Sequence, residues 1–329
     1  MSEQGVAQEI GRSMGLFKIL ITGAGTTTAM TAFKGLRAIK DSSLHITMGD
    51  MQRDCAGAYL GDDFVQMPPG TTPDFVERAI AICRQRRIDL VFPIIDYEFL
   101  GWAQAAAPLA QSGTQVVISP VKALQICLEK DLTDAYFRSV GAPCPCTWRS
   151  TEIPNAQTLP FPVIIKPRCG RASLDTYRAD NIEEYRFYLP RVPDPIVQPY
   201  LRGQEVTIDN FSDLQGRFLA ASPRIRLEVK GGQAFKSLTI DAPELVEFAH
   251  RIVEPLPIIG PSNIQCFLTD EGVRFFEINP RFGAGSILSI AAGMNGPAAL
   301  VAMVRGEELP PLTPRPDLLM MRYWEEVFT

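Results

Sequence analysis

Three polar side chains that could bind ligands or take part in catalysis occur at every second position in the segment FFEINPRFGAGS, residues 275–286. Side chains two residues apart on a β-strand point to the same face, so Glu277, Asn279 and Arg281 would lie together. A strand that serves only packing would carry aliphatic side chains at these positions. A carboxylate and an amide beside a guanidinium instead indicate a cation site next to an anion site.

The residues before this strand, NIQCFLT at 263–269, are predicted to pair with it as a hairpin. A three-residue loop, 270–272, places Gln265 directly opposite Glu277, whereas a two-residue loop would shift the pairing by one and break the grouping. The other face of the hairpin would then be apolar, formed by Cys266, Phe276 and Ile278. We therefore expect Mg²⁺, with Mn²⁺ as the alternative ion, to be bound by Gln265, Glu277 and Asn279. An exposed polar face of an edge hairpin is the competing interpretation.

Composition and charge restrict the class of protein. The chain has 329 residues, of which 46% are hydrophobic and 21% charged, and its net charge is −5. These values are ordinary for a globular protein and give no electrostatic reason to expect a nucleic-acid partner. We find no apolar run long enough to span a membrane and no secretory signal at the N-terminus. Seven scattered cysteines favour reduced thiols, and we expect a cytoplasmic protein with no membrane contact.

The order of the predicted elements indicates two kinds of architecture. The apolar segment 16–22 ends at a glycine turn and is followed by a helical pattern over 26–39, which begins a βαβ unit. Strands continue to alternate with helices to about residue 120, as in a parallel α/β sheet. From about residue 125 the predicted strands are antiparallel and the helices fewer, so the second half is predicted to be α+β.

The glycine turn Gly23-Ala24-Gly25 raises the possibility of a dinucleotide site. Threonine stands at position 28 where the dinucleotide fingerprint has glycine, and Asp50 ends the second predicted strand, where an NAD enzyme has its ribose-binding acid. One interpretation is an NAD(P)-dependent oxidoreductase. The other is a tight turn in a sheet domain without a dinucleotide, in which the helix N-terminus still suits a carboxylate or phosphate.

The segment EINPRFGAGS, together with the upstream NIQ, resembles the metal-binding end of ATP-grasp enzymes, in the branch related to the carbamoyl-phosphate synthase large subunit. The resemblance extends from Leu16 onward through motifs in the same order, which are KILITGAG, LEKDLTDAYFRSVGAPCP, IIKPRCGRAS and IVQPYLRGQEVTID. The loop Gly170-Arg171-Ala172-Ser173-Leu174-Asp175 departs from the family because it has fewer glycines. The chain is also too short for the duplicated synthase and has no glutamine-hydrolysing segment.

The resemblance implies an α/β pre-ATP-grasp domain of Rossmann type followed by α+β ATP-grasp domains. The implied boundaries are an N-terminal extension at 1–15, the pre-ATP-grasp domain at 16–123, the lid subdomain at 124–195 and the C-terminal subdomain with the metal hairpin at 196–329.

The resemblance also implies a role for each matching residue in binding ATP. The phosphate-binding residues would be Lys130, Lys166 and Ser173. The hinge that binds the adenine would comprise Gln198, Tyr200 and Leu201. Glu205 would accept the ribose hydroxyls, and Arg281 would contact the phosphate being transferred. Between the hinge and the hairpin, Arg224, Arg226 and Lys236 are candidates for binding the substrate carboxylate or the γ-phosphate, with solvated strand charges as the alternative.

The implied activity is that of a carboxylate–amine ligase. Such an enzyme phosphorylates a small-molecule carboxylate with ATP and couples the acyl phosphate to an amine, and we expect an amino acid among its substrates. Because relatives often dimerise, a homodimer is an open alternative to the monomer. A third hypothesis, motivated by the glycine-poor loop, is an ATP-binding protein of ATP-grasp shape without catalytic activity.

Overall fold

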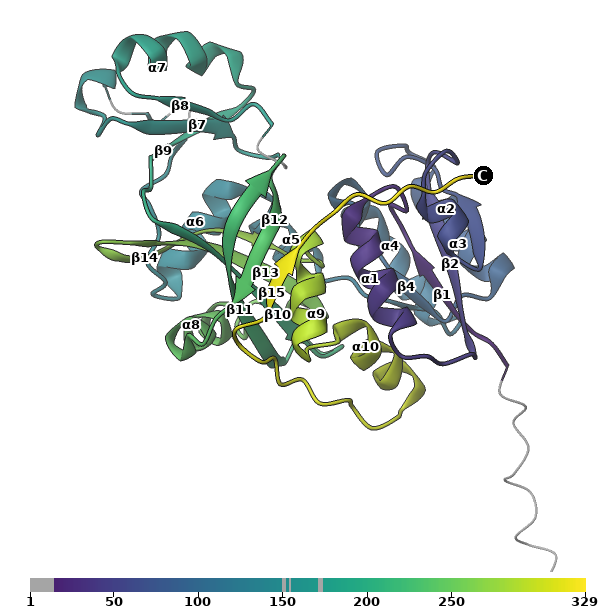
Figure 1. Cartoon of the computed structure of the whole chain (residues 1–329). Helices are drawn as coiled ribbons and strands as arrows, with labels where there is room; N and C mark the ends of the chain where they lie inside the picture. The colour runs from purple at the N-terminus through teal and green to yellow at the C-terminus, as the bar shows by residue number, and fades with distance from the viewer. Residues whose placement is uncertain (1–14, 150–151, 154, 171–173) are drawn as a thin grey trace, which may run out of the picture.

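A computed structural model describes residues 15–149, 152–153, 155–170 and 174–329 of the chain. Three β-sheets form the framework in these residues (Figure 1). A parallel sheet lies on one side of the molecule, a six-stranded antiparallel sheet occupies the centre, and a small four-stranded sheet stands off the body as a lid. The predicted order of fold classes, an α/β domain followed by α+β domains with antiparallel sheets, is confirmed.

The first sheet is parallel, with the strand order β3-β2-β1-β4-β5. Its strands are β1 Phe17–Ile21, β2 Leu44–Asp50, β3 Asp63–Gln66, β4 Leu90–Phe92 and β5 Gln115–Val116. The helices between them are α1 Thr27–Arg37, α2 Gly57–Leu60, α3 Phe75–Arg86 and α4 Phe99–Ala110, and η1 Asp96–Glu98 follows β4. After β1 the chain turns at Gly23, whose φ of +65° suits glycine, and the Thr26 hydroxyl oxygen caps α1 by accepting from the Ala29 N–H at 3.1 Å.

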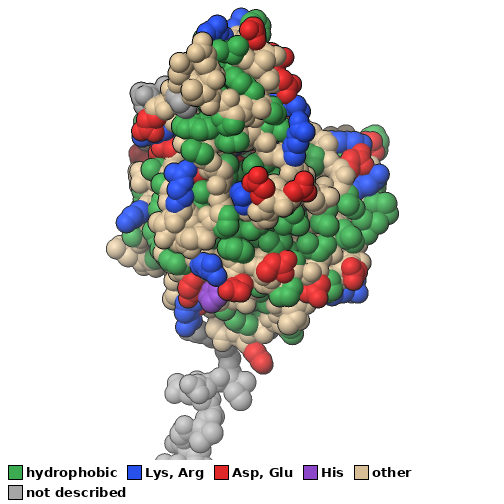
Figure 2. Space-filling model, turned by 90° about the vertical axis from the view of Figure 1, so that its left-hand side faces the viewer, with side chains coloured by type: hydrophobic (Ala, Val, Ile, Leu, Met, Phe, Trp, Pro, Cys, Tyr) green, Lys and Arg blue, Asp and Glu red, His purple; other side chains and the backbone are tan. Residues whose placement is uncertain are grey.

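The lid contains the four-stranded sheet, ordered β6-β9-β7-β8. Its elements are β6 Trp148–Arg149, η2 Ala156–Thr158, β7 Val163–Pro167, β8 Tyr177–Ala179, α7 Ile182–Tyr188, η3 Leu189–Arg191 and β9 Pro195–Pro199. A small core of its own holds it together, in which Val163 and Ile165 of β7 are buried with Tyr185 of α7. Figure 2 shows the side of the molecule that carries the lid, where basic and acidic side chains are interspersed.

The central sheet is antiparallel, with the order β14-β13-β10-β11-β12-β15. Its strands are β10 Gln204–Ser212, β11 Phe218–Lys230, β12 Gln233–Thr239, β13 Pro261–Thr269, β14 Gly272–Asn279 and β15 Leu319–Met321. The accompanying helices are α5 Val121–Leu128, α6 Lys130–Ser139, α8 Pro243–Val253, η4 Ala284–Ser286, α9 Ile287–Ala292 and α10 Gly296–Arg305. One face of the sheet is apolar and packs on α5, α6 and α8, with Val206, Ile264 and Ile278 buried there.

The β13–β14 hairpin corrects one prediction and confirms another. The loop is shorter than predicted, because Thr269 pairs with Gly272, and the three-residue loop was therefore wrong. Phe276 forms a bulge that restores the register, so Gln265 faces Glu277 as predicted. Together, the shorter turn and the bulge exchange the predicted places of the two phenylalanines: Phe275 is fully buried in the core, and Phe276 lies outside it. The expectation that Phe276 lies on the apolar face was wrong.

The largest hydrophobic cluster joins the parallel sheet to the C-terminal part of the chain. Ile19 of β1 and Leu36 of α1 are buried in the same cluster as Phe282 and Leu300. This cluster crosses the predicted division at residue 123, whereas two other clusters lie almost entirely on opposite sides of it. In the described part of the chain, no helix is long and apolar enough to cross a membrane.

The exchange of the two phenylalanines can be tested by mutation. Phe275→Ala is expected to lower the free energy of unfolding by about 3–5 kcal/mol, because it empties a filled core position. Phe276→Ala is expected to cost only about 1 kcal/mol, because this ring lies outside the core. Urea denaturation monitored by circular dichroism measures both values. A larger loss in Phe276→Ala than in Phe275→Ala would show that the bulge is absent.

Candidate active site

The second face of the central sheet is polar, and the strand register aligns its side chains in rows. Glu277, Gln265, Thr207 and Arg224 are successive partners across β14, β13, β10 and β11. The alternation of side chains along each strand gives this face its polar character and leaves the aliphatic residues for the helices behind. The predicted metal ligands and the predicted substrate arginines therefore share one surface.

Glu277 is the one carboxylate among the predicted metal ligands. In the described part of the chain this carboxylate has no hydrogen-bond or ion-pair partner. The two predicted amide ligands already accept hydrogen bonds: Arg226 donates to Gln265 Oε1 at 3.2 Å, and Arg281 donates to Asn279 Oδ1 at 3.3 Å. Sequence reasoning did not identify Asn263, whose Oδ1 accepts from Asn279 Nδ2 at 3.2 Å.

A magnesium ion fits this donor set. No group of three or more His, Cys, Asp or Glu suited to a metal occurs among the described residues, so the available ligands are one carboxylate and two amide oxygens. Mg²⁺ uses few protein oxygens when phosphate oxygens and water complete its coordination. The free Glu277 carboxylate matches that requirement, although Gln265 and Asn279 would have to exchange arginine donors for the ion.

The two predicted phosphate lysines converge on Glu277. Lys166, on β7, has its ammonium 5.7 Å from the Phe276 ring centroid. Burial and the nearby Lys130 lower the pKa of Lys166 to about 8, while Glu277 opposes this shift. Burial also lowers the pKa of Lys130, whose ammonium donates to the Gly170 carbonyl at 3.0 Å. In the described residues neither lysine forms an ion pair with an acid, so both charges are available to a polyanion.

The predicted adenine hinge lies at the end of β9. Gln198 is buried and donates from Nε2 to Thr147 Oγ1 at 2.7 Å. The Tyr200 N–H donates to the Pro162 carbonyl at 2.9 Å, and within the described residues the Leu201 N–H has no partner. The Leu201 backbone is thus the free donor of this hinge. Ser173, the remaining predicted phosphate ligand, lies outside the described residues.

The three remaining predicted site residues do not form one group. Glu205 forms an ion pair with Arg226, so these two lie together, and Arg226 Nη2 also donates to the Gly232 carbonyl at 2.7 Å. Lys236 lies elsewhere, half-exposed, with its ammonium 2.8 Å from Glu228. The ion pair with Glu228 gives Lys236 the surroundings of a solvated strand charge.

An acid from the first sheet holds Arg281, and sequence reasoning missed it. Arg281 Nε donates to Asp96 Oδ1 at 2.7 Å and Nη2 donates to Oδ2 at 3.3 Å. Because Asp96 follows β4 in the sequence, this pair connects the parallel sheet to the end of the β13–β14 hairpin. The only available signal was the position of Asp96 at the carboxyl end of a parallel strand, where ligand sites of α/β sheets occur.

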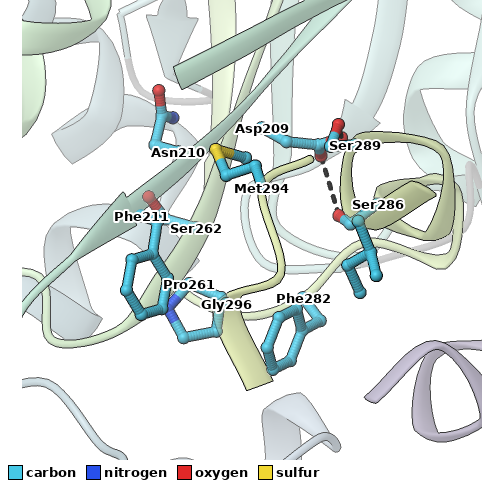
Figure 3. Close-up of a pocket in the computed structure, with 11 residues that line it drawn as sticks. Asp209, Asn210, Phe211, Pro261, Ser262, Phe282, Ser286, Ser289, Met294 and Gly296 are labelled. Atoms are coloured by element: carbon cyan, nitrogen blue, oxygen red, sulfur yellow. Dashed lines mark hydrogen bonds between the residues drawn. The ribbon is translucent and has the colours of Figure 1, made fainter. Parts of the chain in front are cut away.

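The glycines after Arg281 bring the chain onto the side chain of Arg224. Arg224 is buried and pairs with Asp209 through Nε at 2.8 Å. A Cβ on Gly285 would lie 2.6 Å from the Arg224 guanidinium, so only glycine permits this contact. Below this network is a cavity of about 10 Å³, lined by Asn210, Phe282 and their neighbours, which has room for one water molecule and no substrate (Figure 3).

Asp50 accepts hydrogen bonds from the backbone at the first glycine turn, Gly23-Ala24-Gly25. The Gly25 N–H donates to Asp50 Oδ2 at 2.8 Å, and the Gln52 N–H donates to Asp50 Oδ1 at 3.0 Å. Asp50, the predicted ribose acid of the NAD(P) alternative, therefore closes the turn. This geometry favours the interpretation of the turn as part of a sheet domain without a dinucleotide.

The low pKa of Lys166 predicts a pH-dependent affinity for ATP measured without metal. Since its pKa is about 8, the ammonium that attracts phosphate is lost as the pH rises above that value, and the affinity falls with it. The decrease is up to roughly tenfold per pH unit. Isothermal titration calorimetry between pH 7 and 9.5 measures it.

Lys166→Met is expected to bind ATP weakly at pH 7 and to show a flatter pH profile. Lys122→Met, which changes an exposed lysine on α5, is the matched control and should behave like the unmodified protein. A constant affinity of the unmodified protein over this pH range would contradict the assignment.

Comparisons with known proteins agree with this architecture. Residues 191–327 match a family model described as ATP-grasp in the biosynthetic pathway with Ter operon. Residues 19–117 match the PylC-like N-terminal domain.

Solved structures with a similar fold include N5-carboxyaminoimidazole synthetase from Staphylococcus aureus complexed with ADP, with a TM-score of 0.71 and 19% identity over 91% of this chain and 81% of that chain. The L-amino acid ligase from Bacillus licheniformis gives a TM-score of 0.69 and 17% identity over 88% and 74% of the two chains. Biotin carboxylase from Campylobacter jejuni gives a TM-score of 0.69 and 14% identity over 92% and 74%.

At these identities the solved structures establish the fold, and the two family models assign the two ends of the chain. The resemblance inferred from the sequence motifs is thereby confirmed. The chain therefore carries an ATP-grasp family domain at residues 191–327 behind a PylC-like N-terminal domain at residues 19–117.

Proposed function

We propose that the protein is an ATP-dependent ligase that phosphorylates a small-molecule carboxylate and couples the acyl phosphate to an amine, with an amino acid as one substrate. The observation that carries this proposal is the convergence of Lys130 and Lys166, neither with an acidic ion-pair partner, on the uncommitted carboxylate of Glu277. Two uncompensated ammonium groups suit a polyphosphate, and the free carboxylate suits the cation that accompanies it.

The similar structures support the same class of reaction. One is titled an L-amino acid ligase, and another is a synthetase solved in complex with ADP. The shared fold makes ATP the expected nucleotide, and the proposed adenine contact is the free N–H of Leu201. Glu205 is the proposed partner of the ribose hydroxyls, although Arg226 holds its carboxylate in this structure.

In the proposed first step, a carboxylate oxygen of the acid substrate attacks the γ-phosphorus of ATP, and ADP leaves. Lys130 and Lys166 offset the charge on the phosphate oxygens, which is the main contribution a protein makes to phosphoryl transfer. Bound Mg²⁺, held by Glu277, Gln265 and Asn279, would supply charge neutralisation for the phosphates. Arg281, held in position by Asp96, is directed toward the phosphate that becomes part of the acyl phosphate.

In the proposed second step, the amine nitrogen attacks the acyl carbon and forms the C–N bond. The C–O bond to the phosphate breaks, inorganic phosphate leaves with its electron pair, and the nitrogen loses a proton. Because both reactants are held on one sheet face, positioning contributes much of the rate.

The test is ADP release from Mg-ATP with pooled acids and amino acids, followed by mass analysis of the product. Glu277→Gln keeps the shape of the side chain but removes its charge, and it should lower turnover on the order of 100-fold. Glu271→Gln is the matched control, since Glu271 lies at the turn of the same hairpin with its side chain 83% exposed.

Two results would contradict the proposal. Retention of more than half of the turnover in Glu277→Gln would remove this carboxylate from the site. ATP binding without stimulation by any acid–amine pair would instead favour an ATP-binding protein without catalysis.

A further inference from the structure

A second cationic cluster lies on the polar face of the central sheet, apart from the two lysines. It consists of Arg224 on β11 and Arg322, which follows β15 directly. The Arg322 backbone N–H donates to the Phe235 carbonyl at 3.0 Å, and this bond extends the pairing of the C-terminal segment with β12. The two arginines are therefore brought together from segments almost one hundred residues apart in the sequence.

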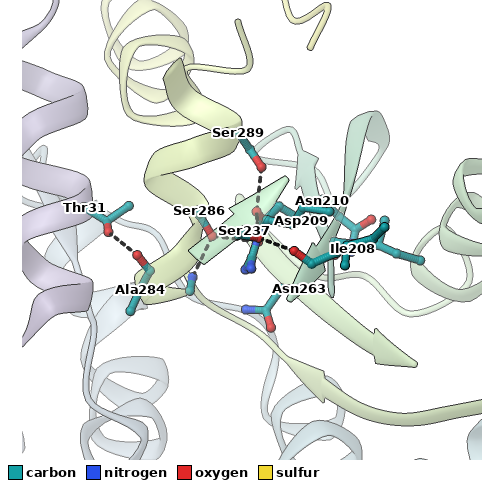
Figure 4. A network of polar contacts seen from close by, with 12 residues as sticks. Thr31, Ile208, Asp209, Asn210, Ser237, Asn263, Ala284, Ser286 and Ser289 are labelled. Carbon is teal, nitrogen blue, oxygen red and sulfur yellow. Dashed lines mark hydrogen bonds and ion pairs between the residues drawn. The ribbon is translucent and has the colours of Figure 1, made fainter. Parts of the chain in front are cut away.

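The only acid bound to this cluster in the described residues is already saturated. Asp209 accepts from Arg224 Nε at 2.8 Å and from Nη2 at 3.3 Å. It also accepts from Ser286 Oγ at 2.8 Å and from Ser289 Oγ at 2.6 Å (Figure 4). Four donors fill the hydrogen-bonding capacity of a carboxylate, and its one negative charge balances one guanidinium.

Arg322 is left without a negative partner in the described part of the chain. Its Nε donates to the Ala234 carbonyl at 2.9 Å, and its Nη2 donates to the Ala284 carbonyl. Both acceptors are neutral, so the charge is hydrogen-bonded but not compensated. Burial and the positive charge of Arg224 lower the pKa of Arg322. A partly buried cation beside a second cation is costly in the free protein, and a bound anion would relieve that cost.

The position of the cluster connects it to the candidate active site. Arg224 lies three strands from Glu277 in the same cross-strand row, which corresponds to roughly 14 Å between backbones. The arginine cluster and Glu277 therefore belong to the same face of the central sheet.

The N-terminus of α1 borders the same region. Thr31 Oγ1 donates to the Ala284 carbonyl at 3.1 Å, and Thr27 Oγ1 donates to Gln233 Oε1 at 2.9 Å. Figure 4 shows Thr31 reaching Ala284 next to the contacts of Asp209. Ala284 thus receives donors from both ends of the chain, which fixes the loop that lies against the two guanidinium groups.

We propose that Arg322, beside the buried Arg224, binds a second carboxylate of the acid substrate, one that is not phosphorylated, so that the substrate is a dicarboxylic acid. The inference rests on the proposed ligase function and names its substrate class. A guanidinium presents paired N–H donors that match the two oxygens of a carboxylate. The protein should therefore bind the diacid more tightly than the corresponding monoamide. The amide carries no charge, and its NH2 group would face the N–H donors of the guanidinium.

Binding to the full-length protein, measured by calorimetry without turnover, tests this inference. The probes are succinate, aspartate and glutamate, each compared with its monoamide, which are succinamate, asparagine and glutamine. At least one acid is expected to bind ten or more times tighter than its amide. Arg322→Gln should abolish that preference and change the affinity for metal-free ATP by less than twofold.

Two further variants separate charge loss from structural damage. Arg315→Gln changes an exposed arginine on the same C-terminal segment and should preserve the preference. Arg322→Lys keeps the charge without the guanidinium fork and should retain part of it, which supplies the decisive comparison if Arg322→Gln does not fold. Equal binding of acid and amide by the unmodified protein, or an unchanged preference in Arg322→Gln, overturns the inference.

Two additional outcomes are informative. Tighter, Arg322-dependent binding of 3-phosphoglycerate than of every dicarboxylate would overturn the carboxylate assignment. Dicarboxylate preference that depends on Arg322, but without ADP release from any substrate mixture, would support the binding site and count against the ligase function alone.

Discussion

The bulge at Phe276 is the constraint on which the candidate site depends. A two-residue turn alone would shift β14 by one position and turn Glu277 toward the apolar helices. One extra residue in β14 reverses that shift over the last three pairs, so that Phe275 fills the core while Glu277 faces Gln265. The bulge also places the Phe276 ring near the Lys166 ammonium. A local irregularity of the backbone thus determines which chemistry the sheet presents.

Unbalanced positive charge is the common property of the two ends of the polar face. Lys166 has a pKa of about 8 because burial and Lys130 act against its charge. At the other end, Arg322 is disfavoured by burial and by Arg224. Between them, Arg281 and Arg226 are neutralised by Asp96 and Glu205. Uncompensated positive charge is therefore found at Lys166 and Arg322, whereas acidic partners hold Arg281 and Arg226 in position.

Much of the fold could be predicted because the signals are local. The alternation of apolar segments and glycine turns gave the parallel sheet, and period-two polarity gave the pairing of Gln265 with Glu277. The predicted three-residue loop was wrong because a two-residue turn followed by a one-residue bulge gives the same pairing of Gln265 with Glu277. The hydrophobic pattern does not distinguish the two arrangements. Asp96 and Arg322 were not identified, since each acquires its role from a partner distant in the sequence. Asp209 could have been found, because it continues the period-two polar series of Glu205 and Thr207 along β10.

The shared hydrophobic cluster couples the stability of the two halves of the chain. Ile19 of β1 and Leu36 of α1 are buried with Phe282 and Leu300, which follow the β13–β14 hairpin. Thr31 reinforces this contact by its hydrogen bond to the Ala284 carbonyl. An exchange of the N-terminal domain between relatives would therefore expose or mismatch this cluster unless the segment through α10 were exchanged as well. The structural unit built around this cluster is therefore discontinuous in sequence.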